Sequence, residues 1–417
     1  MDAERPAVEA AAFPDGTIAI VGAGQAGGWA AHTLRQEGYA GRIVLVGQEP
    51  HAPHERPPLS KAVLAGVATP ESAHLFKPDA FAALRLDWRP GVWVTSIDAT
   101  GKRLTLSDGD CIAYDKLILC TGGRARTLAT PGADTVDVRT LRTVDDALTL
   151  APLLTAGRKL VVIGGGWIGL EVAATARAKG AEVTVVEAQS RLCERSVPRD
   201  ISEHLLALHQ SHGTRVILGA QLARIWRSAD GMSVVEIADG QKVACDTIVA
   251  GVGLVPNDSL AREAGLSCDG GVLVDSACRT SDPSIYAAGD VAVSFNPWAG
   301  RRIRLESWQN AQEQGMAAAR SALGQPVEYQ PLPWFWSDQY GMNLQIYGMP
   351  LPSHRVVARG TPGADGFVLF YLDGDVVQAA LGINAAKGLR FGRRLIEQRR
   401  QVDPQRLADI GTPMAKV

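Results

Sequence analysis

The sequence lacks the closely spaced cysteines and histidines that form metal sites or redox-active pairs. Its six cysteines, at positions 111, 120, 193, 245, 268 and 278, include no CxxC or CxxxxC pair, and its eight histidines include no HExxH motif. No GxSxG motif indicates a hydrolase nucleophile. We therefore expect reduced structural thiols, no bound metal and no dithiol chemistry.

The chain also has little net charge and no long apolar run. A formal net charge of -2 argues against a general nucleic-acid or membrane-surface role, because both need a broad basic field. No apolar run reaches the ~18 residues that cross a bilayer. The first residues, MDAERPAVEAAAFPDG, carry acidic side chains and no apolar core. They predict a flexible start and a cytoplasmic protein.

The sequence contains one pattern twice. TIAIVGAGQAGGWAAHTLRQEGYAGRIVLVGQE, from Thr17 to Glu49, and KLVVIGGGWIGLEVAATARAKGAEVTVVEA, from Lys159 to Ala188, each read as strand, glycine turn, helix and strand. Both are typical of a βαβ unit with parallel strands. A chain of 417 residues has room for about three domains of roughly 150 residues each.

Each repeat carries a GxGxxG motif, formed by Gly22, Gly24 and Gly27 and then by Gly164, Gly166 and Gly169. The first glycine permits the tight turn, the second lets a pyrophosphate approach the backbone, and the third lets helix and strand pack closely. The N–H groups at the helix start then face the anion. Two dinucleotide sites are therefore predicted.

An acidic residue that ends the second strand holds the adenosine ribose in such sites. Glu187 fits this position in the second repeat, and its charge predicts a preference for NADH over NADPH. In the first repeat the strand is followed by Gln48 and Glu49, and we choose Glu49. One site can hold FAD permanently and the other NADH transiently, which predicts a flavin-dependent electron-transfer enzyme.

Beyond residue 327 the composition changes. Short strand-like runs with glycine turns, such as LQIYG, FVLFYLDGD and VVQAALGI, predict an antiparallel sheet, and the basic KGLRFGRRLIEQRR predicts a final helix.

Six motifs together resemble one family of flavoproteins. They are RPPLSK at Arg56, LILCTGG at Leu117, GGGWIGLE at Gly164, YAAGDVA at Tyr286, RLESWQNAQEQG at Arg304 and FWSDQYG at Phe335. The chain resembles the NADH-dependent ferredoxin reductases of bacterial oxygenase systems, which are related to rubredoxin reductases and apoptosis-inducing factor. The resemblance covers nearly the whole chain beyond the first ~16 residues.

The resemblance implies an α/β fold with two Rossmann-like domains of the glutathione-reductase-like three-layer type and a C-terminal α+β domain with an antiparallel sheet. The expected boundaries are 17–125 and 251–327 for the FAD domain, 126–250 for the NAD domain and 328–417 for the C-terminal domain, which completes the flavin site and docks the partner. Relatives usually carry an acid where this chain has Gln48.

The resemblance also implies the roles of individual residues. Asp290 should hold the FAD ribitol chain, Arg56 the FAD phosphates, and Lys61 should lie near the flavin in an ion pair with Glu171. Lys61, Glu171 and Trp308 are the expected catalytic residues. The remaining expected cofactor contacts are Gln25, Ala26, Gln48, Pro57, Val94, Thr121, Gly122, Arg126, Val291, Trp336, Trp167, Ile168, Gly253 and Glu306.

The implied partner is a ferredoxin with a two-iron two-sulfur cluster that serves a Rieske-type dioxygenase or a haem monooxygenase. A candidate docking surface is basic and consists of Arg301, Arg302, Arg304, Lys387, Arg390, Arg393 and Arg394. Two alternatives stay open: an NADH oxidase or quinone reductase, and an NADH-sensing interaction protein.

Overall fold

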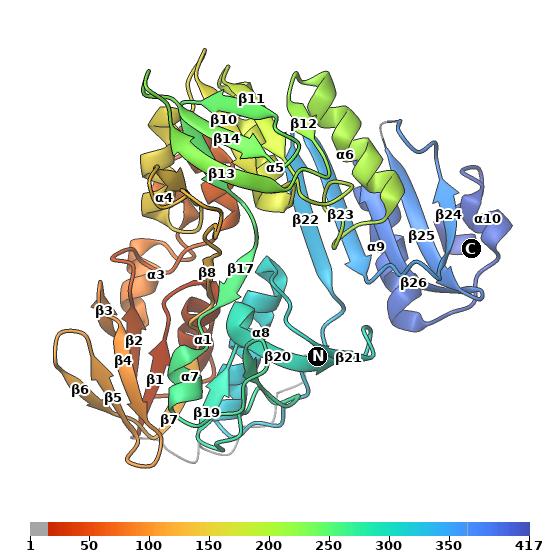
Figure 1. Cartoon of the computed structure of the whole chain (residues 1–417). Helices are drawn as coiled ribbons and strands as arrows, with labels where there is room; N and C mark the ends of the chain where they lie inside the picture. Colours follow the sequence, from red (N-terminus) through yellow and green to blue (C-terminus); the bar gives the residue numbers. More distant parts are fainter. Residues whose placement is uncertain (1–15, 365) are drawn as a thin grey trace. The chain divides into compact units, whose positions relative to one another are not determined.

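The computed structural model describes residues 16–364 and 366–417 (Figure 1). These residues form two compact units. The first consists of residues 16–55, 73–124 and 256–331, and the second of residues 56–72, 125–255 and 332–417. The expected flexible start, residues 1–15, lies outside the described residues. Among the described helices, none has the length and apolar character needed to cross a bilayer.

The first unit is built on a five-stranded parallel sheet in the order β19-β7-β1-β2-β3. Its central strands are buried on both faces, as their uninterrupted apolar sequences predict. The strands are β1 (Thr17–Val21), β2 (Arg42–Gly47), β3 (Asp87–Pro90), β7 (Lys116–Leu119) and β19 (Ile285–Ala287).

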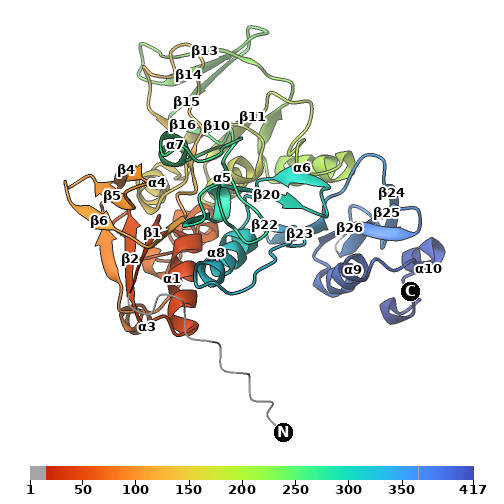
Figure 2. The same ribbon diagram turned by 90° about the horizontal axis from the view of Figure 1, so that it is seen from below.

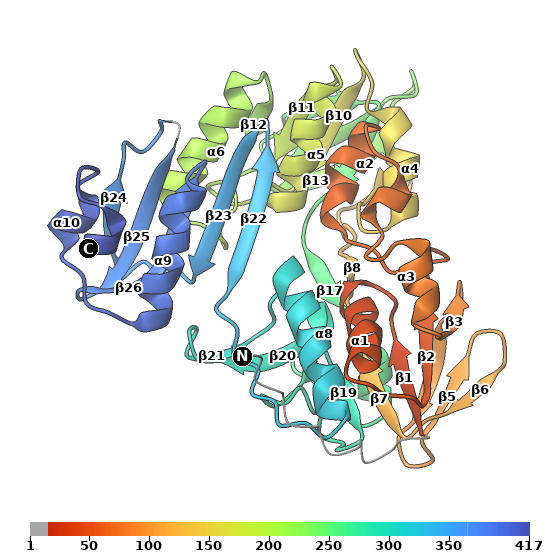
Figure 3. The same cartoon turned by 180° about the vertical axis from the view of Figure 1, so that it is seen from behind.

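Helices α1 (Gln25–Gln36) and α8 (Trp308–Ala322) pack together on one face of this sheet (Figure 3). The opposite face packs against an antiparallel sheet of β4 (Val94–Asp98), β5 (Arg103–Leu106) and β6 (Cys111–Ala113). The unit therefore has three layers. Its smaller elements are α3 (Pro78–Ala83), α7 (Ser259–Glu263), η4 (Gly289–Val291), β18 (Val272–Leu273), β20 (Ala292–Asn296) and β21 (Arg301–Ile303).

The second unit repeats this architecture. Its parallel sheet has the order β12-β11-β10-β16-β9, and helices α4, α5 and α6 pack on one face of it. The elements are β9 (Val138–Arg139), β10 (Lys159–Ile163), β11 (Glu182–Val186), β12 (Arg215–Ile217), β16 (Thr247–Ala250), α4 (Val144–Leu150), η3 (Ala151–Leu153), α5 (Trp167–Ala178) and α6 (Arg199–Ser211).

A separate antiparallel sheet covers the other face of this parallel sheet, and Figure 2 shows its three strands together. They are β13 (Leu222–Arg227), β14 (Ser233–Ile237) and β15 (Lys242–Cys245). The short strands β8 (Gly123–Ala125) and β17 (Leu254–Pro256) pair with each other in a two-stranded sheet.

The last part of the chain forms the predicted antiparallel sheet, in the order β22-β23-β26-β25-β24 (Figure 1). The predicted basic helix is α9, which packs on strand β26. The elements are β22 (Trp334–Gln339), β23 (Met342–Gly348), β24 (Arg355–Arg359), β25 (Phe367–Asp373), β26 (Val376–Ile383), α9 (Ala386–Gln398), α10 (Pro404–Ala408) and η5 (Met414–Lys416). The predicted fold class is confirmed.

One short segment packs with distant parts of the sequence. It contains η1 (Pro57–Ser60), α2 (Ala62–Ala65) and the start of η2 (Pro70–Ala73), and it belongs to the second unit. Leu59, Val63 and Leu64 are buried in the same core as α5. Thr175 Oγ1 also donates a hydrogen bond to the Ser60 carbonyl at 2.9 Å. The predicted three-domain boundaries stay a prediction.

Candidate functional site

The first glycine turn is fixed by close backbone contacts. Gly22 has φ +105°, and a Cβ there would lie 2.2 Å from the Cys120 carbonyl oxygen. A Cβ on Gly27 would lie 1.9 Å from the Gly22 carbonyl oxygen. Both positions therefore need glycine for the fold itself.

Gly24 has a different reason to be glycine. It is the N-cap of α1 in extended conformation, and a Cβ there would meet no atom of the described residues within 4 Å. Within residues 16–364 and 366–417 no side chain caps the helix start, and its first turn contains no acidic residue. The open N–H groups and the helix dipole fit an anion, such as the pyrophosphate of a dinucleotide.

The second glycine turn has the same construction. Gly164 has φ +103° and approaches the Gly251 carbonyl, and a Cβ on Gly169 would lie 2.1 Å from the Gly164 carbonyl oxygen. Gly166 is the N-cap of α5, and its nearest neighbour is 3.9 Å from a Cβ placed there. This helix start also has no side-chain cap in the described part of the chain and no acidic residue in its first turn. Both turns thus fit a dinucleotide phosphate.

The acidic residues expected beside the turns have different surroundings. Glu187 accepts hydrogen bonds from the backbone N–H of Gly165 at 2.5 Å and from that of Gln189 at 2.7 Å. Its carboxylate is therefore held at the glycine turn. In the first unit the Gln48 side chain is exposed, whereas Glu49 is partly buried with Oε2 at 3.6 Å from His54 Nε2.

The Asp290 segment lies against the start of α1. Gly289 donates its backbone N–H to Gln314 Oε1 at 2.9 Å, and a Cβ on Gly289 would lie 3.0 Å from the Ala26 Cβ. Arg304 Nη1 donates to the Asp290 carbonyl at 3.1 Å. This arrangement brings Asp290 and the buried Val291 next to the first glycine turn.

The start of α8 joins the same region. Gln25 Nε2 donates to the Trp308 carbonyl at 2.9 Å, and Ser307 caps the helix by accepting from the Asn310 N–H. Glu306 forms an ion pair with Arg304 at 2.7 Å.

Asn257, which no motif in the sequence marks as a site residue, holds Thr121 in place. Asn257 Nδ2 donates to the Thr121 carbonyl at 3.0 Å, and Thr121 Oγ1 donates to the Asn257 carbonyl at 2.7 Å. Gly122 has φ +60°. Val94 is buried and packs in the core between the two sheets of this unit. The VPND stretch that contains Asn257 has turn character but no signal for this contact.

The second unit contains the expected Lys61–Glu171 ion pair, with Nζ 2.7 Å from Oε2. Glu171 is buried, and it accepts two further hydrogen bonds, from Ser60 Oγ to Oε2 and from Ser337 Oγ to Oε1. Both serines lie in motifs that carry the family resemblance, RPPLSK and FWSDQYG, but neither serine was among the expected site residues. A buried carboxylate with one cation and two hydroxyl donors is well satisfied.

The other expected residues of this unit are spread over several elements. Arg56 Nη1 donates to the Arg142 carbonyl, and Pro57 opens η1. Trp336 stacks on Trp334 with ring centroids 4.9 Å apart. Trp167 packs against Phe335 at 4.8 Å.

Ile168 and Gly253 were also expected at the NADH site. Ile168, on the first turn of α5, is exposed. Gly253 has φ +113°, and its carbonyl accepts the Arg126 N–H at 2.9 Å.

The cysteines lack the properties of a redox centre. Cys120, Cys193, Cys245 and Cys278 are buried, and all six are free thiols. Burial raises the pKa of Cys120 to about 12 and that of Cys245 to about 12, which keeps the reactive thiolate scarce at neutral pH.

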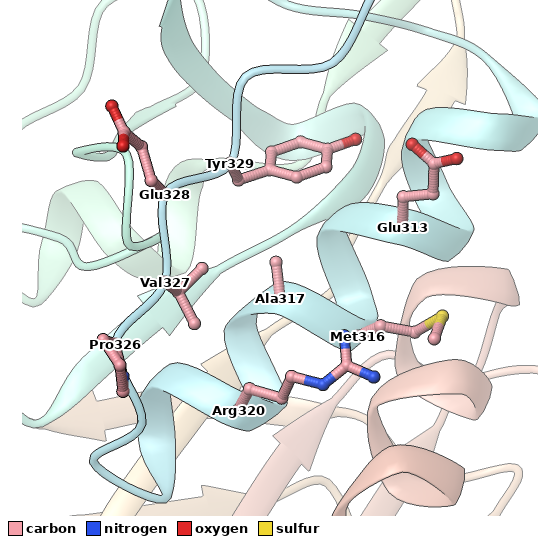
Figure 4. Close-up of a pocket in the computed structure, with 8 residues that line it drawn as sticks. All are labelled: Glu313, Met316, Ala317, Arg320, Pro326, Val327, Glu328 and Tyr329. Carbon is pink, nitrogen blue, oxygen red and sulfur yellow. The ribbon is translucent and has the colours of Figure 1, made fainter. Parts of the chain in front are cut away.

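A pocket of about 340 Å³ lies elsewhere, between α8 and the segment that follows it (Figure 4). Figure 4 shows Arg320, Glu313 and Tyr329 around it. It contains none of the expected site residues. Arg320 is already paired with Glu37 at 2.8 Å.

Comparison with known proteins agrees with this geometry. Residues 16–315 match the pyridine nucleotide-disulphide oxidoreductase family, and residues 334–417 match the reductase C-terminal family. The ferredoxin–NAD(+) reductase component of the anthranilate 1,2-dioxygenase system of Burkholderia cepacia is 40% identical over 391 residues, which cover 94% of this chain and 96% of that protein. Putidaredoxin reductase of Pseudomonas putida is 39% identical over 405 residues, with 96% of each chain covered.

A solved structure is similar as well. The covalent complex of putidaredoxin reductase with putidaredoxin matches with a TM-score of 0.92 at 38% identity, covering 96% of this chain and 97% of that one. The chain therefore belongs to the pyridine nucleotide-disulphide oxidoreductase family and, within it, to the ferredoxin–NAD(+) reductases.

Proposed function

We propose that this enzyme transfers electrons from NADH through FAD to a two-iron two-sulfur ferredoxin, which feeds a Rieske-type dioxygenase or a haem monooxygenase. The observation that carries the proposal is the pair of open helix starts, at Gly24 and Gly166, in one chain of this family. Relatives of nearly the same length are reductase components of dioxygenase systems. Bound FAD supplies acceptance of a hydride from NADH and release of single electrons.

The first unit supplies most of the residues proposed to hold FAD. The α1 N–H groups take the pyrophosphate, Glu49 the ribose and Asp290 the ribitol hydroxyls, because carboxylates accept hydroxyl hydrogen bonds well. Gln25 and Gln314 keep the α8 start and the Asp290 segment against the glycine turn. Thr121, Gly122, Val291, Glu306 and Val94 complete this set.

The second unit supplies the proposed NADH site. Glu187, oriented by two backbone N–H groups, accepts from both adenosine ribose hydroxyls and repels a 2′-phosphate. Trp167, Ile168 and Gly253 are proposed to contact this dinucleotide near the second glycine turn. Arg56 and Arg126 are instead proposed contacts of the FAD phosphates.

Lys61, Glu171 and Trp308 are the residues we propose to act at the flavin. Lys61 carries a positive charge that its pairing with Glu171 holds in one place. A fixed charge orients the reacting groups and tunes electron affinity without abstracting a proton, because hydride transfer needs position more than a general base. Trp336 is proposed to border the same site.

Helix α9 offers a docking surface for an acidic ferredoxin. Lys387, Arg390, Arg393 and Arg394 are all exposed on it. In the first unit Arg301 and Arg302 are exposed, whereas Arg304 is engaged with Asp290 and Glu306. A local positive surface steers an acidic partner without a net positive chain. We place the enzyme in the cytoplasm, where NADH is available and thiols stay reduced.

Rapid mixing under anaerobic conditions tests the proposal. NADH is expected to bleach the flavin absorbance quickly, NADPH slowly, and oxidised two-iron ferredoxin to restore it. A protein purified without flavin would contradict the two-site assignment. Reoxidation by oxygen or a quinone but not by ferredoxin would favour the oxidase alternative, and a long-lived reduced complex that changes oligomeric state would favour the sensor.

A further inference from the structure

A chain of buried side chains connects Glu171 to helix α6. Ser337 Oγ lies 2.7 Å from Glu171 Oε1, and Gln339 Nε2 lies 3.0 Å from Ser337 Oγ. Gln339 Oε1 lies 2.8 Å from His209 Nε2. All four side chains are at most 4% exposed. Bulk water therefore does not replace these hydrogen bonds. In each of them one partner must supply the proton and the other must accept it.

The two carboxylate oxygens of Glu171 have different hydrogen-bond partners. Lys61 Nζ and Ser60 Oγ both approach Oε2, whereas Ser337 Oγ approaches Oε1. A lysine ammonium can only donate. An ionised Glu171 therefore needs the Ser337 proton directed at Oε1.

The direction of the Ser337 hydroxyl fixes the Gln339 amide. Because Ser337 gives its one proton to Glu171, its oxygen is free to accept from Gln339 Nε2. The amide oxygen then faces His209, so that His209 must carry a proton on Nε2. All donors in this arrangement point toward Glu171.

The opposite arrangement requires a protonated Glu171. If the amide turned over, its oxygen would take the Ser337 proton and its NH2 group would face His209 Nε2, which would have to accept. Ser337 would then have no proton for Glu171 Oε1, and two bare oxygens 2.7 Å apart would repel unless Glu171 carried the proton.

The second nitrogen of His209 favours the first arrangement. Nδ1 is buried and has no hydrogen-bond partner among the described residues. A proton on Nδ1 would leave a buried N–H unsatisfied, which is rarer and more costly than an unsatisfied acceptor. A neutral imidazole with its proton on Nε2 avoids this cost, and burial lowers the His209 pKa in the same sense.

We propose that His209 is a positioning residue, which holds Glu171 ionised and directed at Lys61 by fixing the Gln339 amide and, through it, the Ser337 hydroxyl. The effect on electron transfer rests on the proposed role of the Lys61–Glu171 pair at the flavin. The hydrogen-bond arrangement itself does not depend on that role.

A nuclear magnetic resonance experiment tests the arrangement directly. In the FAD-bound enzyme labelled with [15N]histidine, two-bond proton–nitrogen correlations should show His209 neutral with its proton on Nε2, assigned by loss of the signal in His209→Gln. A proton on Nδ1, or a cationic ring at neutral pH, would overturn the proposal.

The variant Glu171→Gln makes the test sharper. Lys61 and Ser60 keep the new amide oxygen at the Oε2 position, so that its NH2 group donates to Ser337. Ser337 then turns to Gln339, the Gln339 amide turns over, and the His209 proton should move to Nδ1. His204 is the control, because it lies on the same helix but takes no part in the hydrogen bonds that connect Glu171 to His209. Its tautomer should not change. A His209 tautomer that does not change would contradict the coupling.

A kinetic experiment tests the consequence. Gln339→Leu should slow flavin reduction by saturating NADH about tenfold, a factor typical of one lost hydrogen bond, and leave NADH affinity unchanged. His204→Leu should leave both unchanged. Wild-type kinetics in Gln339→Leu would contradict the positioning role. Failure of ferredoxin as acceptor would contradict only the proposed function, because neither readout involves ferredoxin.

Discussion

Lys61 donates to Glu171 at 2.7 Å although 110 residues separate them in the sequence. Glu171 is buried, so that Lys61→Met leaves its charge without a cation, at a cost of about 3 kcal/mol in the free energy of unfolding. We also expect slower flavin reduction by NADH. Urea unfolding and rapid mixing measure the two effects.

The double variant Lys61→Met with Glu171→Gln is the control. Removing both charges should cost less than the sum of the single changes, since no isolated charge remains buried. Additive losses would mean that the pair is not coupled.

Gly24→Ala separates binding from folding. A Cβ at Gly24 meets no atom of the described residues within 4 Å, and the extended backbone there is open to alanine. Because alanine is a poorer N-cap than glycine but lowers the entropy of the unfolded chain, the stability of the flavin-free protein should change by less than about 1 kcal/mol. Its methyl group would occupy the space proposed for the pyrophosphate, so FAD affinity should fall. Thermal unfolding of the flavin-free protein and FAD titration measure these effects.

Gly27→Ala should behave in the opposite way. A Cβ there collides with the Gly22 carbonyl, which should destabilise the flavin-free protein by about 3 kcal/mol.

If Gly24→Ala bound FAD as tightly as the wild type, the open helix start would not be the phosphate site.

Glu187 should set the preference between the two nicotinamide cofactors. A carboxylate facing a 2′-phosphate costs several kcal/mol, so NADH should be preferred at least about a hundredfold in kcat/KM. Glu187→Gln should reduce that ratio, and Glu182→Gln, at the exposed start of the same strand, should not. Steady-state kinetics with NADH and NADPH measure the ratio of the two kcat/KM values. If this ratio were unchanged in Glu187→Gln, Glu187 would not set the cofactor preference.

Charge reversal on α9 tests the docking surface. Arg393→Glu with Arg394→Glu should raise the KM for an acidic ferredoxin about tenfold at low salt and weaken its dependence on salt, with flavin reduction by NADH unchanged. Arg199→Glu is the matched control, because Arg199, like Arg393, pairs with a glutamate four residues on. A ferredoxin KM equal to that of the control would contradict docking at α9.

Local sequence patterns predicted much of the fold. The glycine turns and the strands beside them follow from apolar runs and from glycines that no other residue can replace, as at Gly22 and Gly164. The antiparallel sheet after residue 334 follows from short runs with turns. The Lys61–Glu171 pair came from the resemblance, since nothing in either segment indicates the other.

The rest depends on contacts that leave no local pattern. Ser337 reaches Glu171 across 166 residues, and Asn257 reaches Thr121 across 136. A serine in an extended strand is unremarkable in the sequence, and only the folded chain reveals that its hydroxyl has a buried carboxylate as its acceptor. His209 is equally ordinary, on an amphipathic helix.

The interleaved path of the chain has a consequence for its synthesis. The chain changes unit five times, after residues 55, 72, 124, 255 and 331. The first unit is complete only when residue 331 has left the ribosome. The second unit needs residues 332–417, which contain its last sheet. Both glycine turns therefore emerge long before either unit has all its segments, so two incomplete units coexist during most of the synthesis of the chain.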